Sequence, residues 1–263
     1  MWQVPFRVGG IEVHPVLDGI MPMPTSVLYP DVPESVWRTI QADLTVDGRL
    51  NVPFGGFLAV DPAGTTVLID TGGGATPSPL PDGSSPVRFG ELPRALGALG
   101  VAVERIDLVV LTHFHPDHIG WATVDGAPFF PNASYYVHEL EWASLAAEHD
   151  AHTVLQPIAS QLALWSGPEA TPFPWLSLHH APGHSPGNTL VMISDIEGTD
   201  ELALVGDLFH HPAGIAHPHW RCGFDVDPEA AVRQRIQWAD RLRVAGTPVV
   251  SSHFPGLKPL VRY

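Results

Sequence analysis

The chain lacks several features that mark particular classes of protein. Cys222 is the single cysteine among 263 residues, which excludes an intrachain disulfide and fits a reducing compartment. No apolar run approaches the length of about 18 residues that a membrane helix needs. The opening residues, MWQVPFRVGG, have neither a basic segment nor a long apolar segment, so we expect no signal peptide. These absences predict a cytoplasmic protein that does not enter a membrane.

Basic residues are also scarce. Lys and Arg number 13 against 28 Asp and Glu, which gives a formal net charge of −15. Binding to a phosphate backbone needs clustered Lys and Arg, so this balance argues against nucleic acid as a partner. Bound divalent cations would offset part of the acidity. Charged residues make up only 16% and apolar residues 44%, which disfavours disorder and allows a substantial core.

Apolar runs and turn residues predict that strands come first and that helices then alternate with strands. The runs Phe57–Val60 and Thr66–Ile69 flank the turn residues Asp-Pro-Ala-Gly and predict a hairpin. Asp227 and Pro228 predict the start of a helix that runs to about Ala245. Further strands are expected at 1–20 (as a pair), 106–111, 134–138, 176–180, 189–194, 202–205 and 248–251, helices at 91–99, 139–148 and 154–165, and irregular chain at 75–90 and at 21–50, with a short helix at 34–41.

Neither an internal repeat nor a linker divides the sequence. We therefore expect one domain over residues 1–263. The order of the elements predicts a layered α/β protein in which helices cover sheets.

The strongest chemical signal is the run His113-Phe114-His115-Pro116-Asp117-His118, which follows a buried apolar strand. It offers three imidazoles and one carboxylate, which are suitable donors for zinc and other first-row divalent metals. One ion cannot easily take all four donors from so short a loop. The spacing instead suits two neighbouring ions, with His113 and His115 on one and Asp117 and His118 on the other.

Three residues that follow strand-like runs can complete the two ligand sets. His184 lies in the loop APGHSPG, Asp207 follows LVG, and His253 follows VVSS. Alone, each would be a turn residue or a satisfied polar group, and only the cluster's need for partners makes it a candidate. The completed sets are His113, His115 and His184 for one ion, Asp117, His118 and His253 for the other, and Asp207 as a bridge. Ten other histidines, His210 among them, receive no special role.

These motifs resemble those of a known family. THFHPDH, APGHSPG, GD and SSH, in this order, resemble the motifs of metallo-β-lactamase-fold hydrolases, and Leu68-Ile69-Asp70-Thr71-Gly72 is similar to that family's early motif. The resemblance covers residues from about 55 to 256. It implies an αββα sandwich with the metal ions at the edge where the two sheets meet. It also implies that Asp70 is not a ligand but lies beside the site and orients the metal loop.

Further residues indicate which branch of that family the sequence resembles. A bridging Asp at position 207 is typical of lactonases, glyoxalase-type thioesterases and phosphoesterases, whereas antibiotic-hydrolysing β-lactamases usually lack it. The segment 206–211, together with Asp225 and a helix that carries Arg233 and Arg235, is similar to the branch of N-acyl-homoserine lactonases and methyl-parathion-hydrolase-like enzymes. The acidic charge disfavours the RNA-processing branch.

The resemblance implies a dinuclear hydrolase in which a metal-bridging hydroxide attacks a carbonyl or phosphoryl centre. Asp117 and Asp207 are the expected catalytic residues, with Asp117 also a proton shuttle to the leaving group. Two divalent ions are expected, zinc first, with iron, manganese or cobalt as alternatives. Ser185 is then a loop residue, and Cys222 is expected to be packed.

The expected substrate is a small, neutral and fairly hydrophobic lactone or ester. No cluster of Arg or Lys is present to clamp a glutathione or phosphate tail, which disfavours glyoxalase-type and nucleotide substrates. Aromatic residues beside the motifs are expected to line an apolar cleft, with core packing as an equal alternative for each. They are Phe114, Trp121, Phe209, Trp220, Phe224 and Phe254.

Three alternatives stay open. A thioesterase, glyoxalase II-like or biosynthetic, would use the same site and would be separated by a substrate panel. A mononuclear iron persulfide dioxygenase would use the first ligand set and would leave Asp117, His118 and His253 unexplained. A non-catalytic metal-binding protein would not need all seven ligands. The oligomeric state, a homodimer included, is left open.

Overall fold

The computed structural model describes residues 5–44, 47–75, 88–145, 150–195, 197–199 and 201–261. Its larger sheet has seven strands in the order β1-β2-β3-β4-β5-β8-β9. Strands β4, β5, β8 and β9 run parallel to one another, and the others pair antiparallel. The strands are β1 (Phe6–Val8), β2 (Ile11–Pro24), β3 (Arg49–Val60), β4 (Thr66–Ile69), β5 (Leu108–Val110), β8 (Ser134–His138) and β9 (Leu162–Trp165).

A second sheet has five strands in the order β10-β11-β12-β13-β14. Only its last pair, β13 and β14, is parallel. Its strands are β10 (Glu169–Phe173), β11 (Leu176–His180), β12 (Thr189–Ser194), β13 (Glu201–Leu204) and β14 (Val249–Val250). A small hairpin of β6 (Thr123–Val124) and β7 (Ala127–Pro128) stands apart from both sheets.

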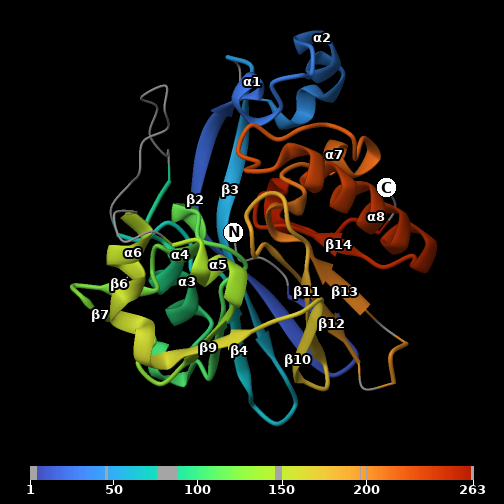
Figure 1. Cartoon of the computed structure of the whole chain (residues 1–263). Coiled ribbons are helices and arrows are strands. Elements are labelled where there is room, and N and C mark those ends of the chain that lie inside the picture. The colour runs from blue at the N-terminus through green and yellow to red at the C-terminus, as the bar shows by residue number, and fades with distance from the viewer. Residues whose placement is uncertain are drawn as a thin grey trace.

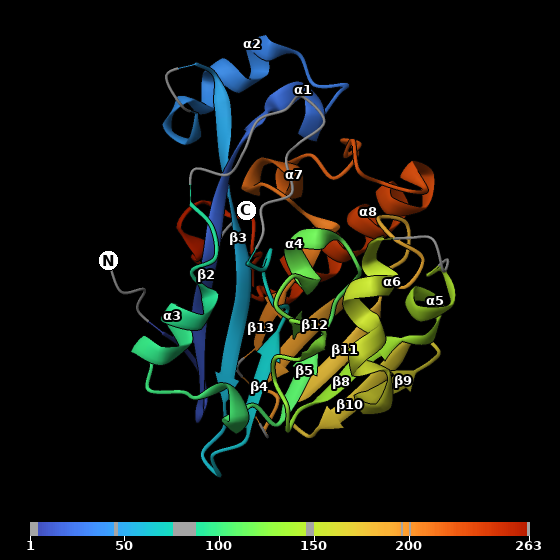
Figure 2. The ribbon, with the colours of Figure 1, turned by 90° about the vertical axis from the view of Figure 1, so that its left-hand side faces the viewer.

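Helices cover the outer face of each sheet (Figures 1 and 2). Those on the side of the seven-stranded sheet are α3 (Leu92–Ala98), α4 (Pro116–Ile119), α5 (Glu139–Ala143) and α6 (Asp150–Leu155). Those on the five-stranded sheet are α7 (Pro212–Ala216) and α8 (Pro228–Ala245), while α1 (Thr25–Leu28) and α2 (Glu34–Trp37) lie beyond the far end of β2 and β3. Short 3-10 turns occupy Arg38–Asp43, Val103–Arg105, Gln156–Gln161, Gly206–Leu208 and Pro255–Leu257. None of the described helices is both long and apolar enough to span a bilayer.

The period of two in a strand explains the layers, because successive side chains point to opposite faces. In β5, Leu108 and Val110 face the core between the two sheets, whereas Val109 faces the helices. In β12, Val191 enters the same central core, whereas Met192 packs beneath α7 and α8. Apolar side chains on both faces of these strands therefore produce the αββα sandwich that the sequence predicts.

The long helix α8 confirms its local signals. Asp227 accepts a hydrogen bond from the Ala230 N–H at 2.9 Å and so caps the first turn. Gly246 ends the helix with φ of 72°, a left-handed conformation that glycine adopts without steric cost. The predicted hairpin is also confirmed, because β3 and β4 pair antiparallel on either side of the Asp61–Gly64 turn.

Two predictions of secondary structure were wrong. Residues 21–50 are not wholly irregular, since β2 continues to Pro24 and pairs with β3 as far as Arg49. Within the described part of the chain, residues 21–24 of β2 pair with β3 and with no strand on their other side, and an edge position tolerates proline. The helix expected at 154–165 is seen only to Gln161, as the end of α6 and a 3-10 turn (Gln156–Gln161), and Leu162–Trp165 is a strand instead. A four-residue apolar run fits a strand as well as a helix. Here it forms a strand because it pairs with the free edge of β8.

Three other expectations need adjustment. The helix expected at 34–41 is α2 followed by a 3-10 turn, and the helix expected at 139–148 is seen as α5, which ends at Ala143. Residues 76–87 of the expected loop and residues 146–149 lie outside the described part of the chain. Strands β6, β7 and β10 and helix α7 were not expected, because they are short and lack a clear period.

The central core should dominate stability. Leu178 lies fully buried between the two sheets, so Leu178→Ala should lower the free energy of unfolding by about 2–5 kcal/mol. Leu164 on β9 is 49% exposed, and Leu164→Ala is the matched control with a far smaller expected loss. Urea unfolding of both variants measures the difference. Equal losses would contradict the placement of the core between the sheets.

Candidate metal centre

Strand ends bring the candidate ligands to one edge of the sandwich. The run His113–His118 leaves the carboxyl end of β5, and its last residues form α4, with Pro116 at the first helical position. The loop that carries His184 follows β11, Asp207 follows β13, and His253 follows β14. A hydrogen bond of 3.0 Å from the Thr189 N–H to the Thr112 carbonyl joins the two sheets beside this edge.

The loop APGHSPG is pressed between two helices, and its glycines explain how it fits. A Cβ atom at Gly183 would lie 2.2 Å from the backbone nitrogen of Ala231 in α8. A Cβ atom at Gly187 would lie 2.5 Å from the backbone nitrogen of Glu141 in α5. Both distances are too short for any side chain, so the two glycines let His184 approach the centre from between α5 and α8.

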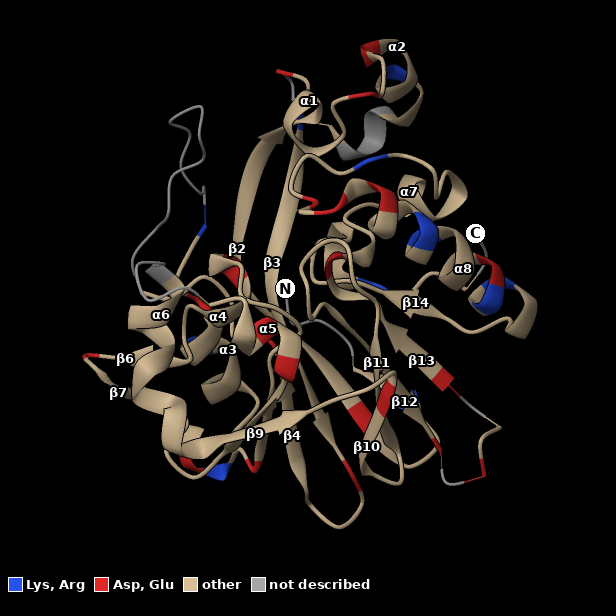
Figure 3. Cartoon of the chain, in the orientation of Figure 1, with Lys and Arg blue, Asp and Glu red and all other residues tan. Residues whose placement is uncertain are grey.

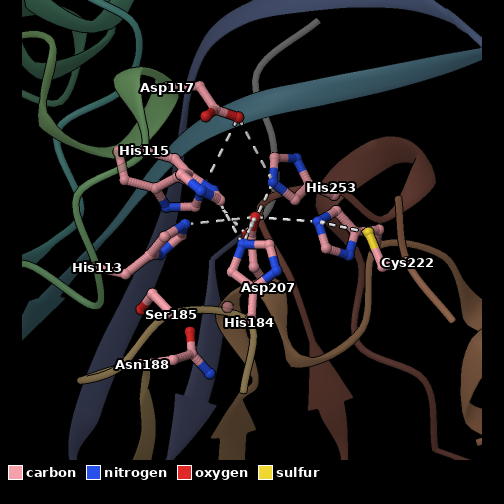
Figure 4. Close-up of polar contacts among 12 residues, drawn as sticks. His113, His115, Asp117, His184, Ser185, Asn188, Asp207, Cys222 and His253 are labelled. Atoms are coloured by element: carbon pink, nitrogen blue, oxygen red, sulfur yellow. Dashed lines mark hydrogen bonds and ion pairs between the residues drawn. The ribbon is translucent and has the colours of Figure 1, made fainter. Parts of the chain in front are cut away.

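The carboxylate of Asp207 lies at the middle of the cluster, and its two oxygens face different partners (Figure 4). Oδ1 lies 3.1 Å from Nε2 of His118 and 2.9 Å from Nε2 of His253. Oδ2 lies 3.2 Å from Nε2 of His184 and 3.5 Å from Nε2 of His113. Asp207 thus stands between two groups of imidazoles.

The two remaining candidates complete these groups. Nδ1 of His115 lies 2.9 Å from Nε2 of His184. The Asp117 carboxylate lies 3.7 Å from Nε2 of His118 and 3.6 Å from Nε2 of His253, and its side chain is 38% exposed. The structure thus brings all seven predicted ligands together. We call His113, His115 and His184 the first donor set, and Asp117, His118 and His253 the second donor set; each has its donor atoms within 4.8 Å of one another.

The outer nitrogens of the histidines are already occupied, which aims the inner ones at the centre. In four histidines Nδ1 contacts a fixed oxygen and leaves Nε2 for the cluster, the arrangement typical of metal-binding histidines. The contacts are His113 with Thr112 Oγ1 (3.1 Å), His118 with Asp70 Oδ2 (2.8 Å), His184 with Asp225 Oδ1 (3.3 Å) and His253 with the Pro53 carbonyl (2.8 Å).

These donors fit divalent metal ions. Among the described residues, Nε2 of His113, Nε2 of His118 and Oδ1 of Asp207 are buried without a well-oriented hydrogen bond. Buried polar atoms in native proteins are almost always satisfied, so such atoms need a further partner. Imidazole nitrogen with carboxylate oxygen is the donor combination that zinc and related ions prefer.

Burial and neighbouring charges shift the pKa values of the cluster in different directions. For His184, burial opposes the charged form, but hydrogen bonds to Asp207 and Asp225 outweigh it and raise its pKa to about 9. For His115, burial and the neighbouring His184 lower the pKa to about 4. For Asp207, burial disfavours the carboxylate, yet His118 and the other imidazoles hold its pKa well below its usual range. A metal ion must therefore compete with bound protons at this centre.

Asp70 lies where it can orient the metal loop. Its carboxylate accepts hydrogen bonds from the Thr112 N–H at 2.8 Å and the Thr112 hydroxyl at 2.9 Å, and it contacts His118 Nδ1. Asp70 itself has φ of 60°, unusual for a residue other than glycine. A backbone contact supports the same junction, because the Thr71 N–H donates to the His118 carbonyl at 2.7 Å.

A cavity of about 220 Å³ opens beside the cluster. Part of the lining is polar, and much of the apolar part, which we call the apolar wall, comes from the protruding part of β2 and β3. Among the described residues that line it, none is Lys or Arg. They are Met21, Met23, Val52, Phe54, Gly73, Phe89, His115, Pro116, Asp117, Asp207, His210, Phe224 and His253.

Most aromatic residues expected in the pocket lie elsewhere. Of the six, only Phe224 lines the cavity. Phe114 and Trp121 pack under the helices of the larger sheet, and the Trp121 N–H donates to Asp18 at 2.9 Å. Phe209 and Phe254 are 1% exposed in the core beneath α7 and α8, and Trp220 packs against the cluster around α1 and α2. Adjacent residues in an extended chain point to opposite sides, so a neighbour of a ligand tends to face the core.

His210 belongs to the site, although we assigned it no special role. Its Nε2 lies 3.0 Å from Asp207 Oδ2, and its ring stacks parallel to that of His253. Its spacing of three residues from Asp207 across a 3-10 turn is the signal that could have identified it. Cys222 is buried as expected, with its sulfur 3.8 Å from His210 Nε2. Burial raises the pKa of the Cys222 thiol, which disfavours the reactive thiolate.

With this geometry established, comparison with known proteins identifies the family. A family model described as the metallo-beta-lactamase superfamily matches residues 57–250. The chain belongs to this superfamily. The match includes six of the seven candidate ligands and leaves out His253.

Solved structures share the fold over nearly the whole chain. The chain is similar to AidC, a dizinc quorum-quenching lactonase in complex with a product, with 24% identity and a TM-score of 0.82 over 97% of this chain and 91% of that one. It is also similar to a probable metal-dependent hydrolase from Staphylococcus aureus, with 22% identity and a TM-score of 0.83 over 95% of this chain and 91% of that one.

A curated relative matches a smaller part. Uncharacterized protein C03F11.2 of Caenorhabditis elegans is 25% identical over 121 residues, which cover 45% of this chain. The aligned part spans 28% of that protein's length.

The pair of Asp225 and Arg235 should hold His184 in place. Helix α8 contains four arginines, and basic residues are visible on it in Figure 3. Arg235 is the buried one, with Nη2 at 2.6 Å and Nη1 at 3.2 Å from the Asp225 oxygens. Arg235→Met leaves the buried Asp225 carboxylate without its arginine partner, with contacts from His184 and the Cys222 N–H remaining, so the free energy of unfolding should fall by about 3 kcal/mol. Arg233→Met, on an exposed position of the same helix, is the control. Urea unfolding of the metal-free proteins tests this, and an equal effect of both changes would contradict it.

Proposed function

We propose that this protein is a metal-dependent hydrolase that opens neutral, fairly hydrophobic lactones or esters at a two-metal centre. The observation that carries the proposal is the position of Asp207, whose two oxygens face two separate donor sets. A carboxylate between two such sets can bridge two ions. We propose zinc for both, with iron, manganese or cobalt as alternatives, in a single domain formed by the whole chain.

The bound ions would lower the pKa of water and polarise the substrate carbonyl. The chain's own residues supply the rest. Asp117 lines the cavity and is partly exposed, so it can accept a proton there and pass it to the leaving group. His210 lines the same cavity, where its Nε2 contacts the Asp207 carboxylate at 3.0 Å and can help to hold that carboxylate in place. Ser185 serves as a loop residue in this proposal, with its hydroxyl donating to Glu141 at 2.7 Å.

The cavity wall supports the choice of substrate. Met21, Met23, Val52, Phe54 and Phe224 offer an apolar surface beside the polar cluster. An apolar wall binds an acyl chain by removing it from water, and methionine adapts to chains of different length. The described part of the lining contains no Lys or Arg, which favours a substrate without an anionic tail. The similarity to AidC, whose bound product is N-hexnoyl-L-homoserine, supports a lactone with an acyl chain.

Metal content tests the centre directly. Protein purified without chelators should carry about two divalent ions per chain. His115→Ala removes one donor of the first donor set and should lose about one ion together with activity, while the fold survives. Asp207→Asn should weaken both positions because it removes the charge between the sets. Elemental analysis measures the ions, with His219→Ala, an exposed histidine outside both sets, as the control. A single iron in the wild-type protein would favour a dioxygenase instead.

A substrate panel tests the reaction. Lactones, esters and thioesters that carry the same series of acyl chains should be cleaved in that order of preference, with longer chains binding more tightly. Phe224→Ala should raise KM for the longest chain about tenfold, or about 1.4 kcal/mol, and much less for the shortest. Phe173→Ala removes an aromatic side chain that packs against the central core instead, and is the control. Preference for thioesters across the whole series would assign the protein to the thioesterases.

A further inference from the structure

Glu141 is a buried carboxylate that touches both loops of the first donor set. It lies in the first turn of α5 and is 3% exposed. Its Oε1 accepts a hydrogen bond from the Phe114 N–H at 2.9 Å. Its Oε2 accepts two more, from the Ser185 hydroxyl at 2.7 Å and from the Gly187 N–H at 2.8 Å. One side chain outside the cluster thus ties together two loops that are about 70 residues apart.

The donors of these hydrogen bonds are next to metal-ligand candidates. Phe114 lies between His113 and His115, and Ser185 follows His184. The two loops leave strands of different sheets, which the hydrogen bond from the Thr189 N–H to the Thr112 carbonyl joins at their base, and Glu141 adds a link at residues adjacent to the ligand candidates. Hydrogen bonds to a carboxylate are about twice as strong as those between neutral groups, which makes Glu141 a firm link.

The backbone of α5 adds a second, independent contact. A Cβ atom at Gly187 would lie 2.5 Å from both the Cβ and the backbone nitrogen of Glu141. The loop that carries His184 therefore rests directly on the first turn of α5. Glycine at this position lets the loop come close enough for its N–H to reach the carboxylate.

The second donor set is held by other groups. Nδ1 of His118 contacts Asp70, and Nδ1 of His253 contacts the Pro53 carbonyl. The three hydrogen bonds that Glu141 accepts come from the two loops of the first donor set. A change at Glu141 should therefore weaken metal binding at the first donor set and leave binding at the second donor set unchanged.

We infer that Glu141 is a positioning residue that holds His113, His115 and His184 at the separation one metal ion requires. The inference rests on the proposed two-metal function and adds the residue that sets the affinity of one position. In Glu141→Gln the amide nitrogen faces one group of N–H and O–H donors, so at least one loop loses its link. Loss of such a supporting contact typically costs about 10–100-fold in metal affinity.

The experiment measures zinc binding to metal-free protein by competition with a chromophoric chelator. Glu141→Gln should lower the affinity of one position about 10–100-fold and leave the other within about threefold of wild type. Glu139→Gln makes the same chemical change two residues earlier, on an exposed position of α5, and should bind both ions as wild type does. The melting temperature of each metal-free variant shows whether the fold itself has weakened.

Two backgrounds identify the affected position. In His253→Ala the remaining strong position is the first donor set, and adding Glu141→Gln should cause the full loss. In His115→Ala the remaining strong position is the second donor set, and adding Glu141→Gln should change nothing. Equal losses in both backgrounds would overturn the inference, because a general loosening of the fold would act on both positions alike.

A milder variant covers the case in which Glu141→Gln does not fold. Ser185→Ala removes one of the three hydrogen bonds and should lower the affinity of the first position several-fold, again without effect in the His115→Ala background. Unchanged affinity in the variant that folds would overturn the inference. The proposed function is judged separately: wild-type protein that binds two ions but cleaves no member of the panel would refute the function and leave the role of Glu141 intact.

Discussion

The buried charge of Asp207 is the constraint on which the edge of both sheets depends. A carboxylate removed from water needs partners that replace its lost solvation, and without them it costs several kcal/mol. Five imidazoles supply ring nitrogens within 3.5 Å of its oxygens. Burial opposes protonation of the histidines, and their neighbours shift the pKa values unevenly: hydrogen bonds to Asp207 and Asp225 raise the pKa of His184 to about 9, whereas burial and His184 lower the pKa of the adjacent His115 to about 4. Divalent ions would supply the missing counter-charge, which couples metal binding to the order of this edge.

Local signals in the sequence account for much of the fold. The cap at Asp227, the left-handed Gly246 and the turn after Val60 could each be predicted because the residues that cause them are adjacent. The strand Leu162–Trp165 could not, because its conformation depends on the exposed edge of β8 rather than on its own residues. The extension of β2 to Pro24 depends in the same way on a distant partner, β3.

Some residues of the candidate site could likewise be predicted from the sequence, whereas others depend on the three-dimensional structure. The loop His113–His118 is visible in the sequence because its donors are close together, and Asp207 could be added because strand ends gather at one edge. His210 needed the geometry of a 3-10 turn to bring it back to Asp207. The role of Glu141 could be recognised only in the three-dimensional structure. Its partners lie 27, 44 and 46 residues away along the chain, and these separations follow no helical or strand period.

The candidate metal ligands and much of the apolar cavity lining lie in different parts of the chain. The span that matches the superfamily, residues 57–250, holds every ligand candidate except His253. Four apolar lining residues precede that span: Met21, Met23, Val52 and Phe54. They lie on the protruding part of β2 and β3, whose pairing carries α1 and α2 beyond the sandwich (Figures 1 and 2). Changes in this extension can reshape the apolar wall without disturbing Asp207, because the wall packs in its own apolar cluster around Tyr29 and Trp37. The substrate preference of the protein should therefore follow residues 21–54 more closely than it follows the metal motifs.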